Sequence, residues 1–276
     1  MIKDIMVHLD GTPEDEIRLN HGLALASTRR AHLIGILTNL LPDLTMTTPV
    51  DARAAARQVL AALEAKARQE GDIAAGRLAG RLAGLQVPNE LRRLDETFSV
   101  LSAKVVEQAR CADLFIATRP YGVTEIPVWL DLVEAVLFGS GRALLLVPPH
   151  HREGPIRTVL VAWNGTRESA RALREGLEFI EQAVRTLVLV VDPAPDAMPW
   201  TNVRHHLAHH GVVADVTTAD SRDRGIADLI LDEARRVSAD LIVMGAYGHT
   251  RFREQVLGGA TRDMLRSTEN LLLLAH

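Results

Sequence analysis

The sequence predicts two tandem α/β domains, each with a parallel sheet covered by helices on both faces. Apolar runs alternate with helical patterns along the 276 residues. These runs are too continuous for a sheet that keeps one face in water, so they favour parallel strands buried on both sides. The same landmarks also occur twice in the same order, which indicates an internal duplication.

The duplication is visible at three places in the chain. "IKDIMVHLDGT", from Ile2, aligns with "IRTVLVAWNGT", from Ile156. "CADLFIATRPYG" aligns with "SADLIVMGAYGH", and "GRALLLVP" aligns with "ENLLLLAH". The join falls in "PPHHREGP", where prolines and a glycine punctuate a polar run. We therefore place the domain boundary near residue 150, which gives domains at 1–150 and 151–276.

The second half shows the alternation most clearly. Apolar runs predict strands at about 157–163, 186–191, 212–217, 240–244 and 271–275. Amphipathic patterns predict helices at about 167–182, 200–210, 223–237 and 259–266. The first half is longer because of the Ala-, Leu- and Arg-rich stretch from Val50 to Leu85. We expect one extended helix there, either packed on the sheet with a charged face in water or used in oligomer contacts.

Composition narrows the class of protein. The chain is 47% hydrophobic and 24% charged, as in ordinary globular proteins. Its formal net charge of -4 argues against a general nucleic-acid binder. The start, "MIKDIMVHLDGTPEDE", has no long apolar core, and no run approaches the roughly 20 apolar residues of a membrane span. The single cysteine, Cys111, favours a reducing compartment, so we expect a cytoplasmic protein in which this thiol is buried.

Glycines and cations gather after the fourth strand of the second half. Gly245 follows the apolar run "DLIVM", and Gly248, Gly258 and Gly259 come soon after it. Ligands of open α/β sheets bind beyond the carboxyl ends of the strands. A glycine lets a ligand approach the backbone, and a helix that starts near Gly259 would point its amides at an anion. His249, Arg251 and Arg253 would supply cationic neighbours, and Thr261 a hydroxyl.

The stretch "GAYGHTRFREQVLGGAT" resembles the phosphate loop of the universal stress protein family, in which the third glycine is usually followed by Ser or Thr. Gly245, Gly248 and Gly258 follow the family's spacing, and "VHLDGT" and "VAWNGT" resemble its first-strand signature. The resemblance implies a five-stranded parallel sheet per domain, related to adenine-nucleotide α-hydrolases. It also implies a bound adenine nucleotide, ATP or another, with or without Mg²⁺.

The resemblance assigns the binding residues position by position. The base and ribose would contact Ala162, Trp163, Asn164 and Val190, and the ribose and phosphates would contact Met244, Gly245, Gly248, Gly258, Gly259, Ala260 and Thr261, with His249 nearby. Two positions depart from the family pattern. Asn164 replaces the usual acidic residue and loses its charge, and Gly259 replaces the usual Ser or Thr and loses a hydroxyl.

The first half lacks most of this loop. Thr118 and Tyr121 stand where the second half has Gly245 and Gly248, and Asp131 stands where it has Gly259. A carboxylate beside a phosphate site would repel the phosphate, and it would also suit a helix N-terminus as a cap. We therefore expect the first half to be a degenerate copy that binds no nucleotide.

The sequence leaves three functions open. The first is a stress-response regulatory protein that binds an adenine nucleotide in its C-terminal domain and acts on an undefined protein partner. The second is a nucleotide-free scaffold whose domains pair through their final strands, "ALLLV" and "LLLLA". In that arrangement one tandem chain would mimic a dimer of the family, and a homodimer of tandem chains is the alternative.

The third function is a weak ATPase or a metal-binding protein. "HHLAHH" places His205 with His209, and His206 with His210, at the spacing of one helical turn, which suits either a metal pair or a polar helix face. The chain lacks the His-x-Gly-His and Ser-Gly-Gly motifs expected of enzymes with a related fold, and it has no Walker lysine pattern. We therefore assign no catalytic residue and no metal ligand, and expect at most slow ATP hydrolysis.

Overall fold

The computed structural model describes residues 1–43, 53–120, 127–193, 200–222, 224–247 and 259–276. The chain folds into two compact units. The N-terminal unit comprises Ile2–Ala117 and Pro127–Ser140. The C-terminal unit comprises Gly141–His276, together with Met1 and the segment that begins at Thr118. The last strand of the first half therefore belongs to the C-terminal unit, and the boundary near residue 150 remains a prediction from the repeats.

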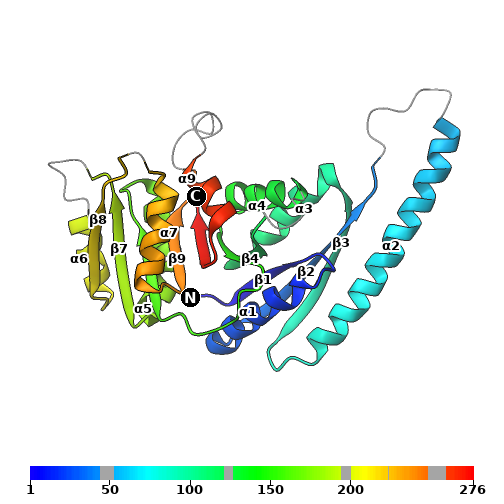
Figure 1. The fold of residues 1–276 in the computed structure, drawn as a ribbon. Helices are drawn as coiled ribbons and strands as arrows, with labels where there is room; N and C mark the ends of the chain where they lie inside the picture. Colours follow the sequence, from blue (N-terminus) through cyan, green and yellow to red (C-terminus); the bar gives the residue numbers. More distant parts are fainter. Residues whose placement is uncertain (44–52, 121–126, 194–199, 223, 248–258) are drawn as a thin grey trace. The chain divides into compact units, whose positions relative to one another are not determined.

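The N-terminal unit is built on parallel strands in the order β3-β2-β1-β4. The helices run along this sheet, and the long helix α2 packs on β2 and β3 (Figure 1). This confirms the extended helix expected from the Ala-rich stretch. The elements are β1 (Asp4–Leu9), α1 (Glu14–Arg29), β2 (His32–Leu41), α2 (Arg53–Ala83), β3 (Asn89–Thr97), α3 (Phe98–Ala109), β4 (Leu114–Thr118) and α4 (Pro127–Gly139).

The C-terminal unit contains parallel strands in the order β10-β9-β6-β7-β8, with β5 added antiparallel to β10. Leu145 of β5 lies opposite Leu273 of β10, so the two final strands pair as expected. The elements are β5 (Ala143–Val147), β6 (Thr158–Ala162), α5 (Arg167–Gln182), β7 (Arg185–Val191), α6 (Trp200–His209), β8 (Ala214–Ala219), α7 (Ile226–Val237), β9 (Leu241–Gly245), α9 (Ala260–Ser267) and β10 (Leu271–Ala275).

The strand cores are apolar because both faces of each sheet are covered. All five residues of β5 and of β10 are buried, as expected for parallel α/β sheets with helices on both sides. The alternation of strand and helix thus confirms the predicted α/β class. The observed β8 begins two residues later than predicted, and α7 begins at Ile226 after the left-handed Arg222 and the N-cap Gly225.

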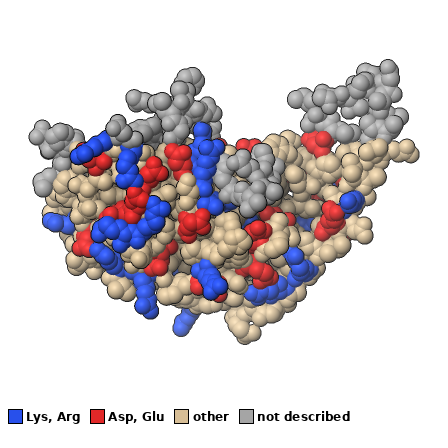
Figure 2. All heavy atoms as spheres, viewed as in Figure 1, with Lys and Arg blue, Asp and Glu red and all other residues tan. Residues whose placement is uncertain are grey.

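Two further expectations concern the surface. Cys111 is exposed, not buried, because it lies in the turn between α3 and β4, one residue before the buried Ala112. In the face shown in Figure 2, basic and acidic side chains are interspersed. Among the described helices, none is both long and apolar enough to cross a membrane.

Candidate functional site

A cleft opens in the C-terminal unit where β6, β7 and β9 end. Its space is about 690 Å³, including the part open to solvent. Side chains from the N-terminal ends of α5, α7 and α9 complete its wall. The lining residues are Ala162, Trp163, Asn164, Ser169, Leu189, Val191, Ile226, Ile230, Met244, Gly245, Tyr247, Ala260 and Thr261.

The turn between β6 and α5 shapes one wall of the cleft. Asn164 Oδ1 accepts hydrogen bonds from the backbone N–H of Thr166, at 3.2 Å, and from its hydroxyl, at 2.9 Å. Gly165 takes the left-handed conformation that this turn requires, with φ +75°. Thr166 then caps α5 by accepting the N–H of Ser169. The carbonyl oxygen of Asn164 is thus used by the turn, and its amide group supplies donors, where a carboxylate would supply acceptors.

Gly245 is required by packing at the end of β9. A Cβ atom at this position would lie 2.5 Å from the carbonyl carbon of Glu168 and from the backbone nitrogen of Ser169. The sequence suggested that this glycine leaves room for a ligand. The structure shows that the room is taken by the first turn of α5, although the backbone of Gly245 still lines the cleft.

A hydrogen bond joins the residues on both sides of the glycine-rich loop. The backbone N–H of Tyr247 donates to Thr261 Oγ1 at 3.2 Å. Tyr247 has a left-handed backbone, with φ +54°, and Thr261 is buried in the first turn of α9. Gly259, in an extended conformation, is the N-cap of this helix. Thr261 therefore fixes the backbone of Tyr247.

The structure brings most of the predicted binding residues together at this cleft. Two of those described do not line the cleft. Val190 is buried, and its strand neighbours Leu189 and Val191 line the cleft instead. Side chains alternate along a strand, so an error of one position exchanges the two faces. Gly259 is the N-cap of α9, one residue before the lining residues Ala260 and Thr261. Gly248, His249 and Gly258 lie outside the described residues.

Sequence reasoning missed several lining residues. Ile226 and Ile230 are four positions apart on α7, a spacing that places both on one helix face. This signal was in the sequence, but an apolar stripe on a helix equally predicts core packing. Ser169 and Tyr247 carried no separate signal. In the described lining no side chain carries a charge, so this part of the cleft suits an uncharged aromatic ring and a sugar.

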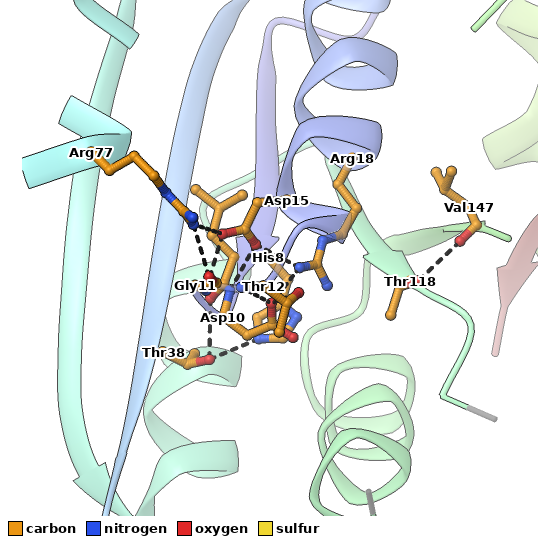
Figure 3. Close-up of polar contacts among 11 residues, drawn as sticks. His8, Asp10, Gly11, Thr12, Asp15, Arg18, Thr38, Arg77, Thr118 and Val147 are labelled. Atoms are coloured by element: carbon orange, nitrogen blue, oxygen red, sulfur yellow. Dashed lines mark hydrogen bonds and ion pairs between the residues drawn. The ribbon is translucent and has the colours of Figure 1, made fainter. Parts of the chain in front are cut away.

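The corresponding place in the N-terminal unit contains a cluster of charged residues (Figure 3). The repeat aligns Asp10 with Asn164, Asp15 with Ser169, and Arg18 with Ala172. Arg18 Nη2 lies 2.6 Å from Oδ1 of both Asp10 and Asp15. All three side chains are almost completely buried, and Arg77 of α2 contacts Asp15 at 3.4 Å.

His8 extends this cluster at the position aligned with Ala162. Its Nε2 lies 2.8 Å from Thr38 Oγ1, and its ring packs edge-on against Trp129 with centroids 4.8 Å apart. Burial, reinforced by the Arg18 cation, lowers the pKa of His8 to about 3, so the ring is neutral at pH 7. In the first copy, side chains joined by hydrogen bonds and ion pairs therefore occupy the place where the second copy has a cleft.

The two carboxylates of the cluster differ in their pKa. Burial raises the pKa of Asp15 to about 6, although the Arg18 cation opposes this shift. Burial acts on Asp10 in the same direction, but Arg18, His8 and the Thr12 hydrogen bond together hold the pKa of Asp10 well below its usual range. The shared guanidinium therefore stabilises the charge on Asp10 more than the charge on Asp15.

Asp131 does not have the capping role that the sequence suggested. Helix α4 begins at Pro127, so Asp131 lies one turn inside the helix, and its side chain is exposed. It is therefore not the N-cap of this helix. The buried charges found in the first copy belong to Asp10, Asp15 and Arg18 instead.

The histidine run lies on α6 and the turn that follows it. The rings of His206 and His210 pack edge to face with centroids 4.8 Å apart, and His210 Nδ1 lies 2.9 Å from Glu181 Oε1. In the described part of the chain, no three His, Cys, Asp or Glu side chains are grouped as metal ligands would be.

Comparison with known proteins gives a family match for the second half of the chain. Residues 155–275 match the model of the universal stress protein family. Among curated proteins, none matches this sequence. A universal stress protein from Archaeoglobus fulgidus, 12% identical, superposes with a TM-score of 0.72 over 99% of this chain and 96% of its own.

Two further solved structures are similar to all or part of the chain. A candidate universal stress protein from Pseudomonas aeruginosa, 16% identical, has a TM-score of 0.60 over 99% of this chain and 93% of its own. A half-length universal stress protein solved in complex with cAMP is 23% identical and covers 45% of this chain and 98% of its own, with a TM-score of 0.38. Residues 155–275 are thus similar to the universal stress protein family, and over its full length the chain has the fold of universal stress proteins of similar size.

Proposed function

We propose that this protein is a regulatory binding protein that holds one adenine nucleotide, ATP or a related nucleotide, in the cleft of its C-terminal unit. The observation that carries the proposal is the position of the cleft. It lies beyond the carboxyl ends of three parallel strands and beside the N-terminus of a helix, where nucleotides bind in α/β proteins.

The wall of the cleft suits the base and ribose of the ligand. Leu189, Ile230 and Met244 provide apolar contacts, and Trp163 provides an aromatic side chain. Asn164 and Thr261 provide hydrogen-bonding groups in the lining of the cleft. The phosphates would extend toward the N-terminus of α9, where backbone N–H groups and the helix dipole favour negative charge.

The N-terminal unit would bind no nucleotide. His8, Asp10 and Asp15 fill the positions that Ala162, Asn164 and Ser169 occupy in the second copy. An incoming phosphate would also meet two buried carboxylates that share one guanidinium. The proposed regulation therefore depends on one occupied cleft per chain, and the response would be read by a protein partner.

Calorimetric titration of the purified protein with ATP, ADP, AMP and GTP tests this function. We expect binding of the adenine nucleotides, and we expect Ala162→Trp to abolish it because the indole would fill the cleft. Ala170→Trp is the matched control, since Ala170 lies on the exposed face of α5. If the wild type binds none of the four, and denaturation of the purified protein releases no nucleotide, the nucleotide-free scaffold replaces this proposal.

A further inference from the structure

We propose that Arg119 is a positioning residue for the nucleotide cleft, although it is not among the residues described as lining that cleft. Arg119 follows β4 of the first copy, yet its side chain fixes the C-terminal end of α9 in the second copy. The opposite end of α9 contributes Ala260 and Thr261 to the cleft. This inference rests on the proposed function for its effect on binding, whereas its structural part can be tested without a ligand.

The contacts of Arg119 converge on the end of α9. Its Nη1 lies 2.9 Å from the backbone oxygens of both Arg266 and Thr268. The same nitrogen lies 3.4 Å from the carboxylate of Glu269. The Arg119 side chain is 13% exposed, so the guanidinium is largely withdrawn from water, and its charge strengthens the hydrogen bonds to the two backbone oxygens. The Glu269 side chain is 75% exposed, so water screens that ion pair.

A cap at its C-terminal end would stabilise helix α9. It contains eight residues, and helices of this length are marginal without tertiary contacts. The last carbonyl groups of a helix have no partner within it, and a cation near them interacts favourably with the helix dipole. Arg119 supplies both the donor and the positive charge.

The backbone of Arg119 is itself anchored. Its N–H donates to the carbonyl oxygen of Val147 at 3.3 Å, and the hydroxyl of Thr118 donates to the same oxygen at 3.3 Å. Val147 is the last residue of β5, and β5 pairs with β10, the strand that follows α9. Arg119 therefore holds α9 against a fixed strand.

The helix transmits this constraint to the cleft because it is short and its inner face is buried. Met264 and Leu265 are fully buried between the two ends. At the N-terminal end, Thr261 accepts the hydrogen bond that fixes Tyr247. With a rise of about 1.5 Å per residue, the capped end and the cleft end lie roughly 12 Å apart along one rigid rod.

The duplication explains how the first copy acquired this role. The repeat aligns Arg119 with Ala246 and Thr118 with Gly245. In the second copy, Ala246 is buried, and its N–H bonds to Ala275 of β10. In the first copy, Thr118 and Arg119 thus stand where the second copy has two small residues, and their side chains support the site of the second copy.

Hydrogen–deuterium exchange and titration with ATP test the proposal on wild type, Arg119→Ala and Arg119→Lys. Without ligand, we expect Arg119→Ala to speed amide exchange in residues 260–268. With ATP, we expect about tenfold weaker binding, because charge-assisted hydrogen bonds are lost. Arg119→Lys keeps the positive charge but loses the planar guanidinium group. Its amide exchange in residues 260–268 and its affinity for ATP should therefore lie between those of wild type and Arg119→Ala.

The matched control is Arg110→Ala. Arg110 Nε donates to the carbonyl oxygen of Gly139 at 3.2 Å, so this variant also removes an arginine from a helix C-terminus, but in the N-terminal unit. It should leave the exchange of residues 260–268 and ATP binding unchanged. Wild-type exchange and wild-type affinity in Arg119→Ala would overturn the proposal, as would equal losses of affinity in both alanine variants. If the wild type binds no nucleotide, only the proposed function fails, and the exchange of α9 still decides the role of Arg119.

Discussion

Gly245 and Ser169 approach so closely that a Cβ atom on Gly245 would lie 2.5 Å from the backbone nitrogen of Ser169. This contact joins the end of β9 to the first turn of α5, and both residues line the cleft. The glycine therefore determines how near the helix can lie to the strand. The geometry of the cleft depends on a packing contact before any ligand is considered.

Gly245→Ala should destabilise the protein, because the added methyl group meets backbone and not the end of a flexible side chain. We expect a loss of about 1–3 kcal/mol in the free energy of unfolding, as for other overpacked sites. Gly80→Ala is the control, since a Cβ there meets nothing within 4 Å and alanine favours the helix. Chemical denaturation measures both. Equal stability of wild type and Gly245→Ala would show that α5 can move away freely.

Arg18→Met should destabilise the N-terminal unit more than any loss of a surface ion pair. The variant leaves Asp10 and Asp15 buried without their shared cation, and breaking a buried pair in this way costs about 3–5 kcal/mol. Arg92→Met, which removes an exposed pair with Glu90, is the control and should change stability by less than about 1 kcal/mol. Thermal and urea unfolding distinguish the two, and similar values for both would contradict a tightly buried cluster.

The stability of the N-terminal unit should depend on pH through His8. Its pKa is about 3 in the folded protein against 6.5 for an ordinary histidine, so between these values the unfolded chain binds a proton that the folded chain does not. Stability contributed by His8 is therefore lost as the pH falls below about 6.5, at about 1.4 kcal/mol per pH unit. Asp15 acts oppositely: with a pKa near 6 against 3.8, it gains stability as the pH falls through 6.

The variant His8→Gln separates these two contributions, because glutamine can still bond Thr38 but does not titrate. The stability advantage of wild type over His8→Gln should shrink by about 2 kcal/mol between pH 6.5 and pH 5. Urea unfolding at several pH values gives this difference directly. A constant difference over that range would mean that His8 titrates normally in the folded protein.

The fold was largely predictable from the sequence because it depends on local apolar runs. The strand "LLLLA" and the helix from Arg167 to Gln182 were predicted with their observed bounds. The start of α7 was not predicted with its observed bound. Arg222 has a left-handed backbone before this helix, and arginine is not a residue type that indicates a turn. The exposure of Cys111 depends on where the turn before β4 ends, which an apolar run that begins at the next residue does not specify.

The site was predictable where it follows the repeat and the glycine spacing, and not where it depends on distant contacts. Arg119 contacts the end of a helix at Arg266, which lies 147 positions later in the chain, and no local pattern indicates such a contact. The cluster in the first copy did have a signal. Asp15 and Arg18 lie on the buried face of α1, three positions apart, where the second copy has Ser169 and Ala172. Charged residues in an apolar helix stripe indicate a buried ion pair.

Native mass spectrometry of the protein with excess ATP tests the central claim most directly, because it counts nucleotides per chain. We expect one nucleotide on the wild type, one on His8→Gln and none on Ala162→Trp. Two nucleotides per chain, or one that persists in Ala162→Trp, would contradict the account in which only the second copy keeps an open cleft.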